Sequence, residues 1–139
     1  MSPGQPPSLP EFLADHCLGI GVADGIRERG YIVHTLRSVY GEDRARIIHD
    51  EDWIPDAARA GRIILTKDKR LHREPLIVAA MQGSEARLFC LTDGNLRGAE
   101  MRRRFLVNLN RIIQRGARRG PYIYAVHAAS LELRWPKST

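Results

Sequence analysis

The sequence has little cysteine and no long apolar run, and each absence excludes a class of protein. Its two cysteines, Cys17 and Cys90, form no C-x-x-C pair, and its five histidines show no H-x-x-x-H spacing, so zinc sites and structural disulfides are not expected. The apolar stretches end after a few residues in a charge or a glycine, and the Pro-rich N-terminus lacks a basic-then-apolar signal pattern. We therefore expect a cytoplasmic protein that has no membrane segment.

The chain of 139 residues has the length of one domain, and 43% of its residues are hydrophobic, which is enough for a substantial core. Four prolines lie among the first ten residues, and they predict an irregular N-terminal arm at 1–10. We expect a single domain at 11–130, followed by a C-terminal tail at 131–139 in which no clear pattern occurs.

Positive charge is concentrated in one part of the chain. The formal net charge is +6, yet the segment 97–119, here called the arginine segment, holds eight arginines and a single acid, Glu100. Such a segment favours a polyanionic partner, with nucleic acid as the first candidate, because cations that neutralise phosphates release counterions. A solvated helix face is the alternative interpretation. Arg104, Arg111 and Arg115 share one face of the predicted helix and are the candidate RNA contacts.

Alternating strand and helix patterns predict the fold class. Apolar stretches bounded by turn residues predict strands at 11–14, 31–36, 62–66, 87–91 and 122–127. Helical spacing predicts helices at 18–30, 50–60, 76–82 and within 97–119, while 37–49 is polar and irregular. Strands that alternate with helices favour an α/β fold, here a three-layer α/β/α sandwich with a mainly parallel central sheet of four to five strands.

Acidic residues follow three of the predicted strands. Asp15, Asp68 and Asp93 would meet at one edge of a parallel sheet, where active crevices form. The cluster Asp50-Glu51-Asp52 begins the helix between the second and third strands. Two carboxylates about 4 Å apart repel by about 4 kcal/mol at an effective dielectric near 20, so converging acids need a cation or shared protons. Mg²⁺ or Mn²⁺, which prefer oxygen ligands, would resolve that repulsion.

The order of these motifs resembles the PIN-like domain family, in particular the compact branch of its ribonuclease toxins of VapC type. The resemblance rests on Phe12-Leu13-Ala14-Asp15, Asp50-Glu51-Asp52-Trp53-Ile54-Pro55-Asp56-Ala57, Leu65-Thr66-Lys67-Asp68-Lys69-Arg70 and Leu91-Thr92-Asp93-Gly94-Asn95-Leu96. It implies that Asp15, either Asp50 or Asp52, and Asp68 are the catalytic metal ligands. Because the spacing between the second and third motifs departs from the larger family, the choice between Asp50 and Asp52 stays open.

The resemblance also implies a function and partners. It implies an endoribonuclease that depends on Mg²⁺ or Mn²⁺, cleaves cellular RNA of the tRNA or rRNA class and serves as the toxin of a type II toxin–antitoxin pair. A cognate antitoxin would neutralise it, within a homodimer or a toxin–antitoxin hetero-oligomer. Thr66 and Asp93 are possible additional site residues, and Lys67, Lys69 and Arg70 are candidates for contact with RNA phosphates.

Simpler interpretations compete with these roles. Asp15 and Asp50 could merely cap helices or favour the helix dipole, and Asp68 could be an exposed turn residue. For Asp93 we favour a turn, and for Trp53 a place in the core. Two other functions also fit the residues: a receiver-like module in which an aspartate accepts a phosphoryl group, and a non-catalytic module that binds nucleic acid through the arginine segment.

Overall fold

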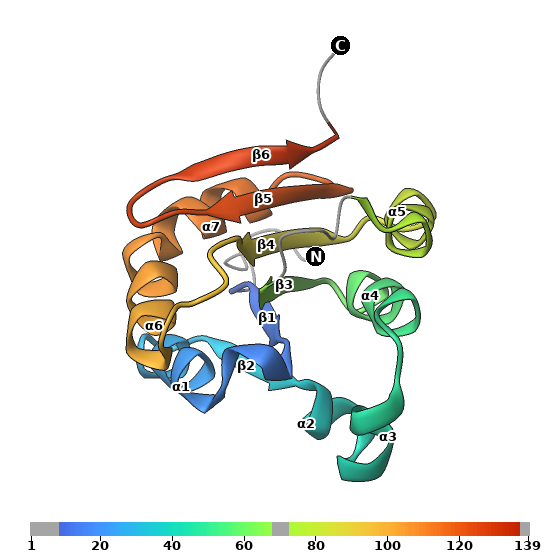
Figure 1. Ribbon diagram of the computed structural model, residues 1–139, viewed down its shortest axis with the longest axis horizontal. Helices are drawn as coiled ribbons and strands as arrows, with labels where there is room; N and C mark the ends of the chain where they lie inside the picture. Colours follow the sequence, from blue (N-terminus) through green and yellow to red (C-terminus); the bar gives the residue numbers. More distant parts are fainter. Residues whose placement is uncertain (1–8, 68–72, 137–139) are drawn as a thin grey trace, which may run out of the picture.

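A six-stranded sheet forms the centre of the computed structural model, which describes residues 9–67 and 73–136 (Figure 1). The strand order is β2-β1-β3-β4-β5-β6. The strands are β1 (Glu11–Ala14), β2 (Ile32–Thr35), β3 (Arg62–Lys67), β4 (Arg87–Leu91), β5 (Tyr122–Val126) and β6 (Leu131–Trp135). The first five strands pair in parallel, whereas β6 is antiparallel to β5. The predicted mainly parallel sheet is thus confirmed.

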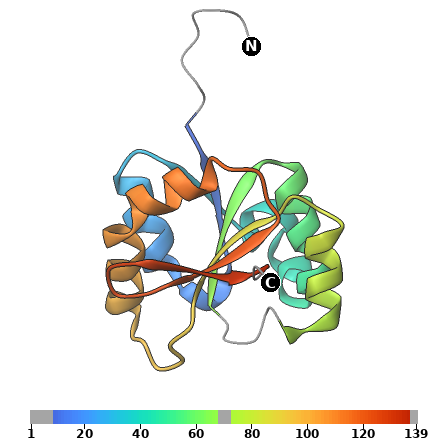
Figure 2. The ribbon, with the colours of Figure 1, turned by 90° about the horizontal axis from the view of Figure 1, so that it is seen from above.

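Helices cover both faces of this sheet, which confirms the three predicted layers (Figure 2). One face carries α1 (Ile20–Glu28), α6 (Gly98–Val107) and α7 (Leu109–Gly116). The other carries α2 (Leu36–Tyr40), α3 (Glu42–Ile47), α4 (Asp50–Arg59) and α5 (Pro75–Gln82). A short 3-10 helix, η1 (His16–Leu18), follows β1. Among the described residues, every helix is too short or too polar to cross a lipid bilayer.

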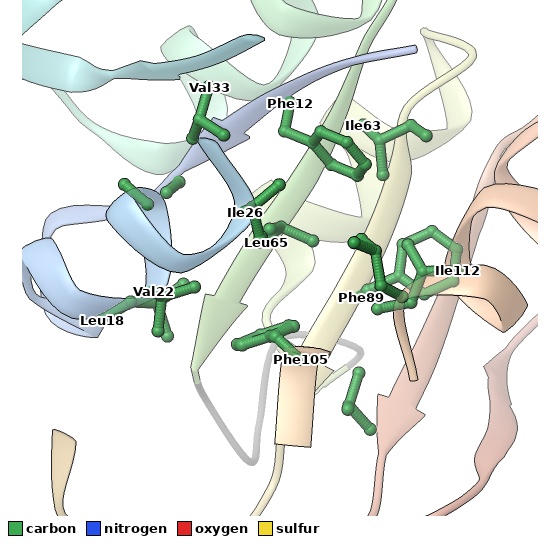
Figure 3. Close-up of a cluster of buried hydrophobic side chains, with 14 of the residues drawn as sticks. Phe12, Leu18, Val22, Ile26, Val33, Ile63, Leu65, Phe89, Phe105 and Ile112 are labelled. Atoms are coloured by element: carbon green, nitrogen blue, oxygen red, sulfur yellow. The ribbon is translucent and has the colours of Figure 1, made fainter. Parts of the chain in front are cut away.

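Two buried clusters of apolar side chains, one on each face of the sheet, hold the layers together. Figure 3 shows the cluster beneath α1, α6 and α7, where Phe12, Leu65 and Phe89 of the strands meet helix residues such as Ile26 and Phe105. Their chain neighbours point to the opposite face because successive strand side chains alternate. The second cluster accordingly contains Leu13, Ile64, Leu88 and Cys90 from the strands and Trp53 from α4.

The structure departs from the sequence prediction in three elements. The sheet is one strand larger than predicted, because Leu131–Trp135 of the predicted tail pairs with β5 as β6. The polar segment 37–49 forms most of α2 and all of α3 rather than irregular chain. The single predicted helix in 97–119 is broken at Asn108 into α6 and α7. There the Asn108 amide donates to the carbonyls of Arg104 and His127, at 2.9 and 2.8 Å.

The strand order places a crevice at a definite point of the sheet. From β1 the chain continues first to β2 on one side, and later to β3 on the other side. In parallel sheets a crevice opens at the carboxyl ends of the strands where the order reverses in this way. Asp15 directly follows β1, and Thr66 lies near the end of β3. The topology therefore brings these two residues to the crevice.

Candidate active site

Asp15 is held in place by the strand on which Thr66 lies. Its backbone N–H donates to the Leu65 carbonyl at 2.9 Å, and the Thr66 hydroxyl donates to its Oδ2 at 2.9 Å. Thr66 is 3% exposed and the Asp15 side chain is 13% exposed, so little water competes for this bond. Asp15 precedes η1 as its N-cap, yet its side chain makes no capping hydrogen bond. The capping interpretation of the Asp15 carboxylate is therefore wrong.

Asp50 reaches the same site from α4, of which it is the first residue. Its Oδ1 accepts a hydrogen bond of 2.9 Å from the indole Nε1 of Trp53, one turn further along the helix. Trp53 is 2% exposed and belongs to the core, as predicted. Because its ring is fixed by packing, the indole N–H also holds the Asp50 carboxylate. This positioning role was missed in the sequence, although the spacing of three residues on a helix could have signalled it.

These side chains line one hollow of about 220 Å³ at the carboxyl edge of the sheet. Asp15, Asp50, Thr66 and Lys67 all belong to its wall, and we call it the carboxylate pocket. Asp52 is exposed and lies outside that wall. Of the two acids left open by the sequence, the structure thus brings Asp50 to Asp15. Asp68, Lys69 and Arg70 lie outside the described residues, with Asp68 directly following Lys67 in the chain.

Cys17 is a further member of the carboxylate pocket that the sequence did not indicate. Its Sγ lies 3.8 Å from the Thr66 hydroxyl oxygen and 3.8 Å from the Lys67 carbonyl oxygen. Partial burial of the sulfur, together with the nearby Asp15 carboxylate, raises the pKa of Cys17 to about 11. The group is a thiol at neutral pH, and a thiol is a weak nucleophile. We therefore assign Cys17 no role as a nucleophile.

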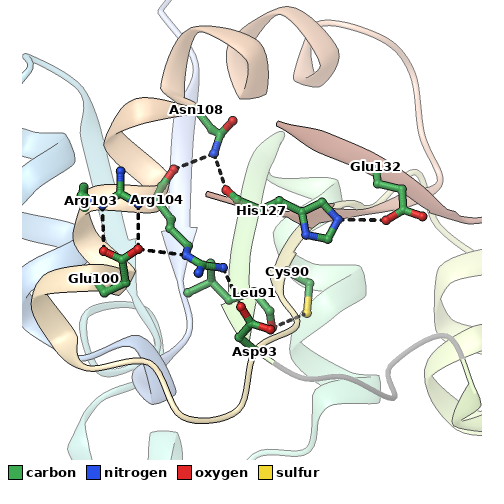
Figure 4. Close-up of polar contacts among 9 residues, drawn as sticks. All are labelled: Cys90, Leu91, Asp93, Glu100, Arg103, Arg104, Asn108, His127 and Glu132. Carbon is green, nitrogen blue, oxygen red and sulfur yellow. Dashed lines mark hydrogen bonds and ion pairs between the residues drawn. The ribbon is translucent and has the colours of Figure 1, made fainter. Parts of the chain in front are cut away.

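Asp93 has a different environment, although it also follows a strand (Figure 4). Its Oδ2 accepts from Arg104 Nη1 at 2.8 Å, and Arg104 Nε donates to Glu100 at 3.2 Å. Arg103 donates twice to Glu100, both times at 2.7 Å. Hydrogen bonds from Arg103 and Arg104 lower the pKa of Glu100 to about 2. Asp93 thus lies in a loop and forms an ion pair, as a structural residue does.

The other candidate RNA-contacting arginines lie away from the carboxylate pocket. Tyr122, the first residue of β5, donates its hydroxyl to the Arg115 carbonyl at 2.6 Å. Arg115 therefore lies at the amino ends of the strands, whereas Asp15 lies at their carboxyl ends. Arg111 donates to the Asn108 side chain at 3.3 Å, and Arg104 is only 14% exposed. The structure does not bring these three arginines to the pocket.

The donor set of the carboxylate pocket suits a hard divalent cation. Within 9–67 and 73–136, no group of three or more His, Cys, Asp or Glu side chains is placed to hold a metal ion. Two carboxylates are nevertheless enough for Mg²⁺, which keeps several waters and is commonly bound through one or two carboxylates plus substrate phosphate. Asp15 and Asp50 supply such a pair, and both are already oriented by a neighbouring donor, Thr66 or Trp53.

Comparison with known proteins connects this geometry to a family. Residues 10–93, more than half of the chain, match the family model described as a PIN like domain. The chain is also 29% identical over 124 residues to a protein of Mycobacterium tuberculosis (strain ATCC 25618 / H37Rv) named "Putative ribonuclease VapC45", covering 88% of this chain and 90% of that protein. No solved structure gives a significant match.

Proposed function

Because the chain belongs to the PIN-like domain family, we propose that it is a metal-dependent endoribonuclease. One observation carries the proposal: Asp15 and Asp50 line the same small pocket at the crevice of the sheet, and each is oriented by a hydrogen-bond donor. The similarity to a protein named as a ribonuclease extends over most of both chains, and the match to the family model at 10–93 includes both Asp15 and Asp50.

In this proposal Asp15, Asp50 and Asp68 hold Mg²⁺ or Mn²⁺. When bound, such an ion lowers the pKa of a coordinated water and stabilises charge on the leaving oxygen of a phosphodiester. The protein's own contribution is orientation. The Thr66 hydroxyl donates to Oδ2 of Asp15, and the Trp53 indole N–H donates to Oδ1 of Asp50. Both carboxylates are therefore oriented before substrate binds. Lys67, in the wall of the pocket, would contact an RNA phosphate.

We further propose that the enzyme is the toxin of a type II toxin–antitoxin pair that cleaves RNA of the tRNA or rRNA class. The motif resemblance and the VapC name of the relative support this biological role. A cognate antitoxin that inserts an arginine or lysine between Asp15 and Asp50 would displace the metal and block RNA together. A toxin–antitoxin complex that retained full RNA cleavage would rule out this mode of neutralisation.

The proposed function is tested by cleavage of total cellular RNA with purified wild type, Asp15→Asn and Asp68→Asn. Reactions contain Mg²⁺, Mn²⁺ or EDTA, and circular dichroism checks that each variant is folded. We expect discrete cuts by the wild type that need the metal and disappear in both variants. Cutting that persists in EDTA and in both variants would refute the proposal. A folded wild type that binds RNA without cutting it would instead favour the non-catalytic module.

A further inference from the structure

A second hollow of about 360 Å³ lies on the other side of Asp15, between β1 and the start of α2. It shares Asp15 and His16 with the carboxylate pocket, so the two hollows are neighbours. We call it the β2-side hollow. Its volume falls within the range of about 300–1,000 Å³ that is usual for ligand sites. None of the roles proposed above uses its wall beyond Asp15.

Two arginines line the β2-side hollow, and they differ in how they are engaged. Arg27 donates to the Val33 carbonyl at 2.7 Å and pairs with Asp24 at 3.3 Å. Arg37 is exposed and makes neither an ion pair nor a side-chain hydrogen bond with any described residue. Arg37 thus offers five donors that the rest of the described chain does not use, in a geometry suited to a phosphate.

The same wall also contains apolar surface. Ile20 is 64% exposed although it begins α1, and it lines the hollow together with Arg37. An exposed isoleucine in the same wall as a guanidinium that pairs with no described residue fits a nucleotide, which has an apolar base face and a charged phosphate. A purely acidic peptide would use the arginine but would leave Ile20 in water. The chemistry of the wall therefore favours RNA over an acidic protein segment.

The surface continues beyond this hollow. A third hollow of about 240 Å³ shares His16 and Arg37 with the β2-side hollow. Its own arginine, Arg46, is paired with Asp43 at 2.6 Å. His16 lines all three hollows, so they adjoin one another around it, and Arg37 lies in the wall that the second and the third share. A single strand that leaves Asp15 through the β2-side hollow would pass Arg37.

We propose that the β2-side hollow is a nucleotide subsite, in which Arg37 binds the phosphate next to the one that is cleaved and Ile20 contacts the adjoining base. The inference rests on the proposed nuclease function, since it identifies the substrate as a single strand that extends beyond the cut on the β2 side. It also makes Arg37, rather than the arginine segment, the principal cation outside the carboxylate pocket for RNA binding among the described residues.

Binding of a fluorescein-labelled pool of 12-nucleotide single-stranded RNA tests the subsite without any cleavage. Three proteins are compared in EDTA: Asp15→Asn, Asp15→Asn with Arg37→Ala, and Asp15→Asn with Arg29→Ala. Arg29 is the matched control, because it is an exposed arginine that lines none of the three hollows. We expect Arg37→Ala to weaken affinity about tenfold, as loss of a charged hydrogen bond does. The slope of log K against log salt should fall by about 0.7.

The possible outcomes separate the subsite from the nuclease function. Equal affinities and slopes for all three RNA-binding proteins would overturn the subsite and leave the nuclease proposal intact. An equal loss for Arg29→Ala would also overturn it, because the effect would then reflect net charge alone. Absence of RNA binding by all three proteins would count against both proposals. Thermal melting followed by circular dichroism verifies that each variant is folded.

Discussion

The acids of the carboxylate pocket and the arginine segment were both linked to RNA in the sequence analysis, but only the acids converge on one site in the folded protein. The pocket gathers Asp15 and Asp50 from elements far apart in the chain and orients each of them. The segment spreads its charge and neutralises much of it. Arg102, Arg103, Arg104 and Arg119 form ion pairs with Glu28, Glu100, Asp93 and Glu85. The number of charged residues in a segment therefore indicates function less well than whether their side chains meet at one site.

Position adds to this difference. Arg104 lies beside Asp93, just after the carboxyl end of β4, whereas Arg115 lies beside Tyr122 at the amino end of β5. The helix between them crosses the face of the sheet and is interrupted at Asn108. Two arginines that share a helix face in a straight-helix prediction thus lie at opposite edges of the sheet. The arginine segment mainly packs and pairs with the protein itself.

The largest expected effect distinguishes two neighbouring acids. Asp50→Asn should lower kcat/KM for RNA cleavage by about 1,000-fold, because loss of a metal-binding carboxylate costs several kcal/mol of transition-state stabilisation. Asp52→Asn is the matched control, since Asp52 is exposed and outside the pocket, and its activity should stay within about twofold of the wild type. The reverse ranking of the two variants would show that Asp52 is the ligand.

A smaller loss of activity is expected when the support of Asp15 is removed. Thr66→Val deletes the hydroxyl that donates to Asp15 Oδ2 and keeps the shape of the side chain. Cleavage should fall by about 10–100-fold, the usual cost of losing a group that orients a metal ligand. Thr66→Ser restores the donor and should recover most of the activity. When the cleavage rate of Thr66→Val is measured against Mg²⁺ concentration, the variant should need more Mg²⁺ than the wild type to reach half of its maximal rate. Unchanged kinetics in that variant would exclude a positioning role for Thr66.

Substitutions in the arginine segment should change the stability of the protein rather than its catalytic activity. Arg104→Met removes a guanidinium that is 14% exposed and bonded to Asp93 and Glu100, so the free energy of unfolding should fall by about 1–2 kcal/mol in urea. Arg115→Met, on an exposed residue, should change it by less than about 0.5 kcal/mol. Both variants should cleave RNA as the wild type does. A hundredfold loss of cleavage in Arg115→Met would reinstate the segment as part of the active site.

The smallest effect concerns pH. Glu100 has a folded-state pKa of about 2, below its ordinary value of 4.5, because Arg103 and Arg104 donate to it. A depressed pKa means that its contribution to stability is fully present above about pH 4.5 and is lost as the pH falls toward 2. Glu100→Gln should therefore flatten the dependence of unfolding free energy on pH in this window. Parallel curves for variant and wild type would contradict the assignment.

The sequence predicted the layers of the fold, and it named Asp15 and Thr66 as candidate site residues, which the structure joins where the carboxyl ends of β1 and β3 share one edge. Periodicity alone was sufficient there, since buried strands leave a strong apolar pattern. The β6 strand was missed although Leu131 and Leu133 alternate with charged residues. Such a short edge strand is stabilised mainly by its pairing with β5.

Other features depend on contacts that no local pattern contains. Asn108 interrupts the predicted helix because its amide donates to the carbonyl of His127, a residue 19 positions away. Arg102 forms an ion pair with Glu28, which lies 74 positions earlier in the chain. The choice of Asp50 over Asp52 as the neighbour of Asp15 follows from the packing of Trp53, which fixes the orientation of α4 against the sheet.

The most direct test of the central claim is binding of Mn²⁺, followed by electron paramagnetic resonance, to wild type, Asp15→Asn and Asp93→Asn in the absence of RNA. Both substitutions remove one carboxylate that follows a strand, but only Asp15 lines the carboxylate pocket. We predict that Asp93→Asn binds Mn²⁺ as tightly as the wild type, while Asp15→Asn binds at least about tenfold more weakly. Equal affinities of wild type and Asp15→Asn would contradict the assignment of the pocket as the metal site.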